Sequence, residues 1–408
     1  MPSQGLPFQR RVWEPSAVRV LFSTTAGAGH FGPLVPFAKA CCAAGHEVKV
    51  AAPASFAGAV HGARLDHAPF ADVPPEIMGP IFGRLPSLSF EEADRTVMTE
   101  IFGRLNAQAA LPGLTAVVNA WKPDVIVREP CEFSSLVAAE RAGIPQVEVS
   151  IGMGSGMDSF LPILAAPLAE LSQLAGLPQD RALAAMSTTV TFTTVPAALD
   201  TGESNDSPRD DTAWRFQDVL LTNGSARLPP SWGEQDHPLI YVTLGSVTAS
   251  IGPFMALYRE TLEALSELPV RVLMTTGDRD DQLSLGAVPA NAHVERWWPQ
   301  AEVMPHAAAM VGHGGFGTTM MALAAGVPQV VVPLFAFDQG VNARRVAAIG
   351  AGIHVPGGPS SAHEIASALT LVLTDPAYRT GAQAVANDMA ALPPVAESVP
   401  ILEALARS

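Results

Sequence analysis

Charged side chains are scarce in this sequence: they make up 15% of its 408 residues, against 48% for hydrophobic residues. That composition allows a large buried interior, and the length suits two domains better than one. Long apolar runs are also missing, since no stretch reaches the roughly 18 uninterrupted apolar residues of a membrane span. Residues 1–17 carry charges and prolines where a signal peptide needs an apolar run, so we expect a loose N-terminal extension and a cytoplasmic protein.

Cysteine and basic residues are few as well. The three cysteines, Cys41, Cys42 and Cys131, are odd in number and lack the spacing of a zinc site, which favours a reducing compartment. The 24 basic residues are outnumbered by 39 acidic ones, giving a net charge of −15. A field of this sign repels a phosphate backbone, so nucleic acid is not expected as a partner. Any smaller phosphate ligand must be held by local dipoles.

What the sequence does contain is a repeated pattern of strands and helices. Apolar runs bounded by turn residues predict buried parallel strands with helices between them. In the first half the strands are expected at residues 18–22, 47–52, 124–127 and 146–149. In the second half they are expected at residues 239–244, 270–275, 308–311, 329–332 and 352–355. The polar, proline-bearing stretch 200–236 between the halves is interpreted as a linker.

This pattern predicts two doubly wound, Rossmann-like α/β domains, over residues 18–199 and 237–385. Residues 386–408 are expected to form a C-terminal helix that packs back on the first domain. Ligands of such sheets bind beyond the carboxyl ends of the strands, so two facing domains imply a cleft between them.

A glycine-rich turn follows one of the predicted strands in the second half. It contains His313, Gly315 and Gly317, and a helix is expected to open at Thr318 and Thr319. Glycines let the backbone approach a ligand closely, and the start of a helix presents unpaired N–H groups with a partial positive charge. The turn therefore predicts a diphosphate site; the alternative is a tight turn whose threonines only cap the helix.

Two further motifs flank this turn. Asp338 and Gln339 stand at the start of another predicted helix, where Asp338 fits an N-cap and the pair equally fits hydrogen bonding to sugar hydroxyls. Upstream, Trp297 and Trp298 precede Gln300 and offer an aromatic face for a nucleotide base, although buried tryptophans more often belong to a core.

Taken in order, these motifs resemble the donor-binding region of family 1 glycosyltransferases, which have the two-domain GT-B fold. The resemblance is carried by Trp298-Pro299-Gln300, His313-Gly314-Gly315, Gly326-Val327-Pro328, Pro333 and Asp338-Gln339. His-Gly-Gly followed by Gly-Thr-Thr is typical of actinobacterial members that glycosylate secondary metabolites such as antibiotics. The resemblance implies a nucleotide-sugar site made by Ser246, Trp298, Gln300, His313, Gly315, Gly317, Thr318, Asp338 and Gln339.

A second glycine-rich turn, Gly27-Ala28-Gly29-His30-Phe31-Gly32, has the spacing of a dinucleotide fingerprint. That interpretation also needs an acidic residue at the end of the next strand, where the sequence has Ala51-Ala52-Pro53, so an oxidoreductase is not favoured. His30 fits better as a general base, because imidazole titrates near neutral pH; the alternative is a histidine that only caps or packs. The resemblance implies the role of base for a histidine at this position.

A histidine base usually needs an acid that orients its other ring nitrogen. In the resembling family an aspartate after the strand at residues 124–127 takes this role. The matching position here holds Glu129, and Glu132 competes for the assignment.

The resemblance also bears on the donor. Plant relatives bind the ribose hydroxyls with a glutamate eight residues after the motif histidine, and the same count here reaches Met321. Without that acceptor, a dTDP-sugar is favoured over a UDP-sugar. Asp278 and Asp280 form an Asp-x-Asp pattern that binds metal in the other glycosyltransferase fold, but they read here as a solvated acidic loop. Neither a metal nor another cofactor is expected.

The expected function is inverting, metal-independent transfer of a sugar to a hydroxyl of a hydrophobic small molecule. Apolar segments at residues 69–102 and 152–164 suit a bulky acceptor, although packing of surface helices explains them nearly as well. Two alternatives stay open: a nucleotide-sugar-binding protein that assists a true transferase, and a nucleotide-sugar epimerase on the same fold. A homodimer is a possible assembly.

Overall fold

The computed structural model describes residues 17–153, 160–200, 213–217, 228–245, 248, 254–277, 285–334, 336–356 and 362–408. Residues 1–16, Ser246 and the acidic loop 278–280 lie outside the described residues, as do residues 154–159 of the second expected acceptor segment.

The first domain is built on a seven-stranded parallel sheet with the order β3-β2-β1-β4-β5-β6-β7. Its strands are β1 Arg19–Ser23, β2 Glu47–Pro53, β3 Asp66–Phe70, β4 Val125–Arg128, β5 Gln146–Val149, β6 Val190–Thr193 and β7 Ala213–Arg215. The central strands β4 and β5 are buried along their whole length, as expected for parallel strands with both faces covered. Their buried charges, Arg128 of β4 and Glu148 of β5, form an ion pair of 2.7 Å.

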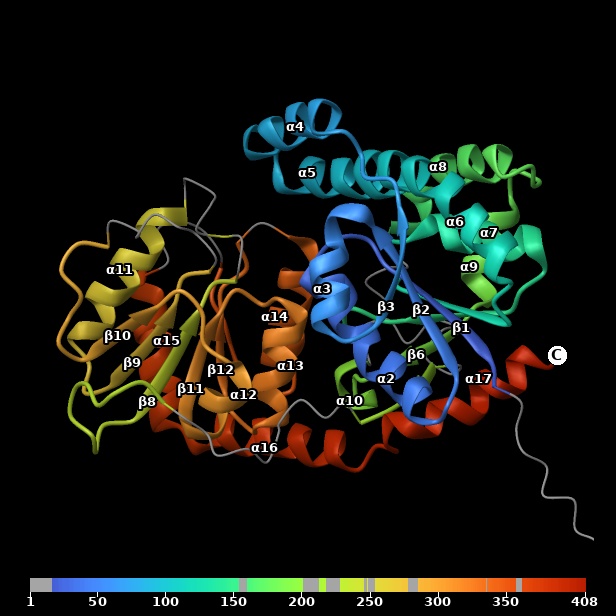
Figure 1. Cartoon of the computed structure of the whole chain (residues 1–408). Helices are drawn as coiled ribbons and strands as arrows, with labels where there is room; N and C mark the ends of the chain where they lie inside the picture. Colours follow the sequence, from blue (N-terminus) through green and yellow to red (C-terminus); the bar gives the residue numbers. More distant parts are fainter. Residues whose placement is uncertain are drawn as a thin grey trace, which may run out of the picture.

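The second domain has a six-stranded parallel sheet with the order β10-β9-β8-β11-β12-β13. Its strands are β8 Leu239–Thr243, β9 Arg271–Thr275, β10 Ala292–Glu295, β11 Ala307–Gly312, β12 Gln329–Val331 and β13 Gly352–His354. The prediction of two parallel-sheet α/β domains is therefore confirmed, and Figure 1 shows the two sheets side by side.

Helices surround both sheets. Those of the first domain are α1 Ala28–Phe31, α2 Val35–Ala43, α3 Ala57–Gly62, α4 Pro75–Arg84, α5 Phe90–Thr96, α6 Ala107–Trp121, α7 Phe133–Ala142, α8 Leu161–Leu174, α9 Arg181–Thr188 and α10 Ala197–Asp200. Those that follow are α11 Met255–Ser266, α12 Gln300–Val303, α13 Phe316–Ala324, α14 Phe337–Ala348, α15 Ala362–Thr374, α16 Pro376–Ala390 and α17 Ser398–Ala406. None of the described helices is long and apolar enough to cross a membrane.

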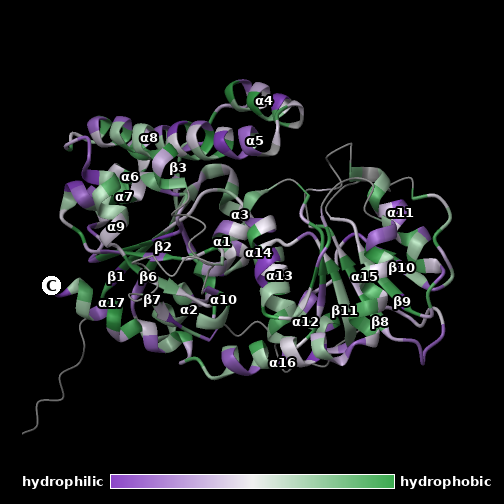
Figure 2. Ribbon diagram, turned by 180° about the vertical axis from the view of Figure 1, so that it is seen from behind, coloured by the Kyte–Doolittle hydropathy of each residue, from purple (hydrophilic) through white to green (hydrophobic). Residues whose placement is uncertain are grey.

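A helical layer lies over the carboxyl-terminal side of the first sheet, at the top of Figure 1. There α5 continues into α6 through a π-helical stretch, Val97–Asn106, and α8 packs beside this rod. Helices α5 and α8 alternate between polar and apolar residues in Figure 2, as expected for helices with one packed face. This layer contributes apolar side chains next to the cleft.

The C-terminal segment joins the two domains. Helix α16 packs on the second domain, and the chain then crosses to the first, where Gln217 N donates to Pro393 O at 2.7 Å. Val399 and Leu402 of α17 enter the first core, and His46 Nε2 lies 3.3 Å from Glu403 Oε1. The crossing comes after Ala390, later than the expected boundary at residue 385, because α16 runs on without a break.

The expected linker 200–236 also contains part of the first sheet. Strand β7 pairs with β6 at the sheet edge, and the ring of Phe216 lies 5.1 Å from that of Phe192 and 5.7 Å from that of Phe37. A strand of three residues is too short to show a periodic pattern, so β7 could not be predicted from the sequence.

Candidate active site

His30 stands at the carboxyl end of the first sheet, in the short helix α1. The turn after β1 becomes helical at Ala28, earlier than the sequence pattern indicated, because Gly27 adopts φ +144° and redirects the chain. The approach is close: a Cβ on Gly27 would lie 3.2 Å from His30 Cδ2. Helix α1 thereby aims the His30 ring at the loop that follows β4.

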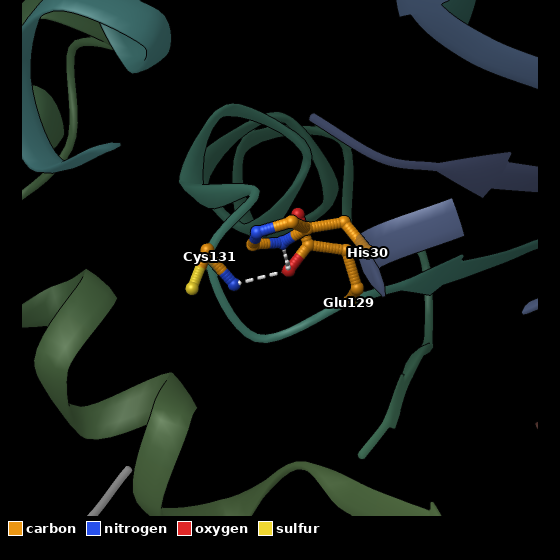
Figure 3. A group of neighbouring side chains, drawn as sticks. All are labelled: His30, Glu129 and Cys131. Carbon is orange, nitrogen blue, oxygen red and sulfur yellow. Dashed lines mark hydrogen bonds and ion pairs between the residues drawn. The ribbon is translucent and has the colours of Figure 1, made fainter. Parts of the chain in front are cut away.

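Glu129 in that loop meets the histidine. Its Oε2 lies 3.2 Å from His30 Nδ1, in ion-pair contact (Figure 3), although the ring N–H is not aligned well enough for a hydrogen bond. Glu129 is 0% exposed, and Thr25 holds its Oε1 through the backbone N–H at 3.1 Å and the hydroxyl at 2.9 Å. Cys131 N donates to Oε2 at 2.6 Å. The carboxylate is therefore fixed by its own neighbours before it contacts the base.

Glu132, the other candidate, has a different task. Its carboxylate accepts hydrogen bonds from Ser134 N and Ser135 N, both at 3.0 Å, and so caps α7. It also accepts from the hydroxyl of Ser23 at 2.8 Å. The structure therefore brings Glu129, and not Glu132, to His30.

The charges around His30 favour its protonated form. Burial is the largest influence and acts to lower the pKa of His30, but attraction to Glu129 and Asp338 outweighs it, and the net pKa is raised above 6.5. The partner responds in the opposite direction: burial acts to raise the pKa of Glu129, while His30 and the N–H groups of Cys131 and Thr25 lower it overall. The pair can thus hold a proton taken from a substrate.

His30 faces a cavity of about 320 Å³ lined by both domains. The first domain contributes Asp94, Phe102 and Phe160 beside His30, and the second contributes Phe337, Asp338 and Asn342. The rings of His30 and Phe102 are 5.1 Å apart. The arrangement places His30 and Asp338, from different domains, on the wall of one cavity.

A second cavity of about 280 Å³ adjoins the first and lies within the first domain. Val97, Phe102 and Cys131 line both. Its other apolar lining residues include Phe70, Met78, Phe82, Ile101 and Phe133. Most of these come from the segment 69–102 that the sequence suggested for an apolar acceptor, and Gly152, Met153 and Phe160 of the other segment line the first cavity.

The glycine-rich turn of the second domain is tighter than expected. Helix α13 begins at Phe316 with Gly315 as its N-cap, so neither Thr318 nor Thr319 caps the helix; the capping interpretation is wrong. Thr318 instead accepts a hydrogen bond from Gln300 Nε2 at 3.0 Å. Gly314 has φ +87°, and a Cβ there would lie 2.7 Å from the carbonyl oxygen of Gln339. The backbone of the turn is thus locked against α14.

His313 is held by glycines on two sides. A Cβ on Gly245 would lie 2.8 Å from His313 Nε2, and a Cβ on Gly315 only 2.5 Å from it. Burial lowers the pKa of His313 to about 4, and a backbone hydrogen bond with Thr243 only partly opposes this. The ring is therefore neutral near pH 7 and can act as a hydrogen-bond donor, not as a cation.

A cavity of about 470 Å³ extends from this turn towards α1. Six residues proposed from the sequence line it: Trp298, Gln300, His313, Gly315, Gly317 and Thr318. Met321 lines it too. Gly29, one residue before His30, also lines this cavity, which therefore ends close to His30. We call it the nucleotide-side cavity, because the sequence predicts that its glycine-rich turn binds the nucleotide.

Asp338 and Gln339 separate in the structure. The N-cap of α14 is Ala336, so the capping interpretation of Asp338 is wrong, and Asp338 lies in the first turn with its side chain on the His30 cavity. Burial raises the pKa of Asp338. Gln339 is buried, and its Oε1 accepts from Leu334 N at 2.8 Å, which satisfies a backbone group left free after β12. Gln339 is absent from the described lining of these three cavities, contrary to the expectation that it faces the sugar.

The sequence did not point to one residue of the site, Asp94, and did not decide between the two tryptophans. Asp94 of α5 accepts a hydrogen bond from Phe337 N at 3.3 Å and so caps α14 from the opposite domain. Trp297 is 70% exposed and lines the nucleotide-side cavity, whereas Trp298 packs on the core of its own domain. The pair of tryptophans was visible in the sequence, but which ring is free depends on packing alone.

Comparisons with known proteins agree with this geometry. Residues 39–232 and 259–405 match the N-terminal and C-terminal domains of the family described as erythromycin biosynthesis protein CIII-like. The L-demethylnoviosyl transferase of Streptomyces niveus is 33% identical over 390 residues, covering 92% of this chain and 95% of that protein. The chain belongs to this family.

Members of the family are antibiotic glycosyltransferases, and this chain is a glycosyltransferase of that type. The TDP-daunosamine transferase DnrS of Streptomyces peucetius is 28% identical over 426 residues, covering 95% of this chain and 97% of that protein. The solved structure of the glycosyltransferase SnogD from Streptomyces nogalater aligns with a TM-score of 0.72 and 29% identity, covering 96% of this chain and all of that one. The GT-B fold expected from the sequence is thereby confirmed.

Proposed function

We propose that this glycosyltransferase moves a sugar from a nucleoside-diphosphate donor to a hydroxyl of a hydrophobic small molecule, with inversion at the anomeric carbon. The observation that carries the proposal is the contact of His30 with the buried Glu129, 3.2 Å apart, on the wall of a cavity shared with Asp338. A base held by an acid is what transfer to a hydroxyl needs.

His30 takes the proton of the acceptor hydroxyl on Nε2, while Nδ1 stays beside Glu129. The freed oxygen attacks the anomeric carbon from the side opposite the diphosphate, and the bond from that carbon to the phosphate oxygen breaks. The electron pair leaves with the diphosphate. One displacement of this kind inverts the configuration, and Glu129 stabilises the imidazolium that forms.

The leaving diphosphate is received at the glycine-rich turn. Negative charge that develops there faces the N-terminus of α13 and the neutral ring of His313, which are fixed in place before the reaction. We propose that these dipoles stabilise the leaving group without a metal ion. Trp297 supplies the exposed aromatic face for the base of the nucleotide.

We propose dTDP over UDP as the carrier. Met321 lines the nucleotide-side cavity, and its thioether sulfur is only a weak hydrogen-bond acceptor. It cannot replace a carboxylate that accepts hydrogen bonds from both ribose hydroxyls. A deoxyribose has one hydroxyl fewer to satisfy, so its fit here is better. The relative DnrS is named a TDP-daunosamine transferase, which supports dTDP as the carrier.

The acceptor is proposed to lie across the two adjoining cavities. Both are lined mainly by apolar side chains, with Phe102 and Cys131 common to their walls. A hydrophobic molecule can fill the space beyond His30 while presenting one hydroxyl to the imidazole.

The decisive test substitutes the base. His30→Ala should abolish transfer and leave the dissociation constant for dTDP within about threefold of the wild-type value, as measured by calorimetry. Turnover near the wild-type rate would overturn the role of His30.

Two further measurements test the rest of the proposal. The anomeric configuration of the product, determined by NMR, tests inversion, and full activity after exhaustive chelation tests metal independence.

A further inference from the structure

A thiol lies beside the catalytic pair. A ring nitrogen of His30, a carboxylate oxygen of Glu129 and Sγ of Cys131 all lie within 4.8 Å of one another. Within the described part of the chain, no other group of three His, Cys, Asp or Glu side chains meets this condition. Figure 3 shows the three residues together, with Glu129 and Cys131 on one loop and His30 reaching them from α1.

The transfer reaction explains two of these groups but not the third. The backbone N–H of Cys131 orients Glu129, whereas its Sγ has no part in moving a proton from the acceptor to His30. His30 Nδ1 is buried and makes no well-aligned hydrogen bond despite its contact with Glu129. A ring nitrogen, a carboxylate oxygen and a sulfur lie within 4.8 Å of one another.

The surroundings of the sulfur carry excess negative charge. The carboxylates of Glu129, Glu148 and Asp338 and the guanidinium of Arg128 act electrostatically on Cys131. Arg128 and Glu148 balance each other in a 2.7 Å ion pair, so the excess negative charge comes from Glu129 and Asp338. Such a field attracts a divalent cation and stabilises it once bound.

We propose that His30, Glu129 and Cys131 form a binding site for a soft or borderline divalent cation of the Zn²⁺ class, and that the bound ion inhibits sugar transfer. Nitrogen, oxygen and sulfur ligands of this kind select Zn²⁺ or Cd²⁺, whereas Mg²⁺ requires a shell of oxygens. The site is distinct from the metal requirement of other transferases, because the ion opposes the reaction.

The geometry needs only a small adjustment. Ligand bonds of about 2.0–2.3 Å place neighbouring ligand atoms roughly 3.5 Å apart. The 3.2 Å separation of His30 Nδ1 and Glu129 Oε2 already suits such a site. The sulfur, at up to 4.8 Å, then has to approach by roughly 1 Å, a small side-chain movement.

An ion can reach this point from the cleft. His30 and Cys131 line the cavity of about 320 Å³ between the domains, so the fourth position of a tetrahedral ion can take a water molecule there. On binding, the Cys131 thiol loses its proton to solvent, and a protonated His30 ring loses its Nδ1 proton to solvent as well, so that the remaining ring proton stays on Nε2. The thiolate and the lone pair of Nδ1 then bond to the ion, and the charge and atoms balance.

The ion is expected to inhibit transfer because it binds Nδ1 of His30. An ion on Nδ1 keeps the neutral ring proton on Nε2, the nitrogen that has to accept the acceptor's proton. The same ion occupies Glu129. A metal-loaded enzyme therefore has neither a free base nor its partner.

Cd²⁺ is the probe for the test, because a cadmium–thiolate bond gives an ultraviolet charge-transfer band that does not depend on transfer activity. The wild-type protein is expected to bind one Cd²⁺ per chain with this band. Cys131→Ser should lose the band, and His30→Ala should keep the thiolate but bind at least about tenfold more weakly. The control is Cys42→Ser, since Cys42 is an exposed cysteine that lines none of the three cavities described above.

Transfer assays with Zn²⁺ give the second measurement, and they are kept apart from the binding test so that a failure of the proposed reaction does not hide the result. Zn²⁺ should inhibit the wild-type protein, and inhibition of Cys131→Ser should need at least about tenfold more ion. Absence of the cadmium band in the wild type, its persistence in Cys131→Ser, or its loss in Cys42→Ser would each overturn the proposal. Cys131→Ala serves as the second variant, and thermal melts establish that each variant is folded.

Discussion

Glu129 reaches His30 from the end of β4, and the 3.2 Å contact joins the carboxyl ends of two neighbouring parallel strands, because His30 follows β1. In Glu129→Gln the charge that raises the pKa of His30 is removed, while the burial that lowers it remains. The base acts unprotonated, so wild-type activity falls as the pH drops through a pKa above 6.5. We expect the acid limb of the pH–rate profile to move to lower pH in the variant, and kcat/KM at its optimum to fall about 10²-fold.

Glu132→Gln is the matched control for that change. Glu132 is equally buried in the same loop but caps α7 through Ser134 and Ser135. In the wild type both carboxylate oxygens accept hydrogen bonds from backbone N–H groups, whereas glutamine turns an NH₂ group towards one of these donors. We therefore expect the free energy of unfolding to fall by about 1–2 kcal/mol. Chemical denaturation measures this loss. A shifted pH–rate profile in Glu132→Gln would contradict the separate roles of the two glutamates.

Gly315→Ala tests the support of His313. The new Cβ would lie 2.5 Å from His313 Nε2, so the ring has to leave its position in the turn. We expect the dissociation constant for dTDP to rise at least about tenfold, the weight of a charge-assisted hydrogen bond. Gly317→Ala provides the comparison, because a Cβ there meets nothing within 4 Å and α13 tolerates alanine. Equal affinities in the two variants, measured by calorimetry, would show that the position of His313 does not matter for the diphosphate.

The contact between the two domains includes a titratable group, the carboxyl of Asp94, which accepts a hydrogen bond from Phe337 N. Burial raises its pKa from 3.8 to about 6, so between these values the folded protein holds a proton on Asp94 that the unfolded chain has lost. Stability associated with this group therefore falls as the pH rises from about 4 to about 6 and stays low above that range. Asp94→Asn keeps an oxygen for Phe337 N without the charge.

We expect Asp94→Asn to be more stable than the wild type at pH 7.5, by an amount on the order of 1 kcal/mol because Asp94 is only partly buried, and to match it at pH 4. Calorimetric melting at the two pH values measures the difference. Glu91→Gln removes an exposed charge from the same helix and should show no such dependence on pH. An Asp94→Asn variant less stable than the wild type at pH 7.5 would mean that the ionised carboxylate stabilises α14 more than burial opposes it.

The sequence predicted those parts of the fold that depend on a short stretch of neighbouring residues. Strands such as β4 and β8 are mostly apolar because both faces are buried, and glycines marked the turns that hold His30 and His313. Strands β3, β6, β7 and β10 escaped prediction. Three of them lie at the edges of their sheets, and β6 is fully buried only in its second half, so none has the unbroken apolar pattern of a central strand. Asp94 could not be found this way, since its partner Phe337 lies 243 positions along the chain. Only packing brings such residues together.

The proposed preference for dTDP rests on Met321, which lines the nucleotide-side cavity together with His313. Met321→Glu should introduce the acceptor that two ribose hydroxyls require, so UDP is expected to gain affinity relative to dTDP by about tenfold. Met321→Gln introduces an acceptor without a charge. We expect a smaller gain in affinity for UDP relative to dTDP, because a neutral amide forms a weaker hydrogen bond than a carboxylate. Competition calorimetry with dTDP and UDP on each variant gives the ratio of dissociation constants. A wild-type protein that binds UDP as tightly as dTDP would show that Met321 does not set the preference. An unchanged ratio in Met321→Glu would place the ribose beyond reach of this position.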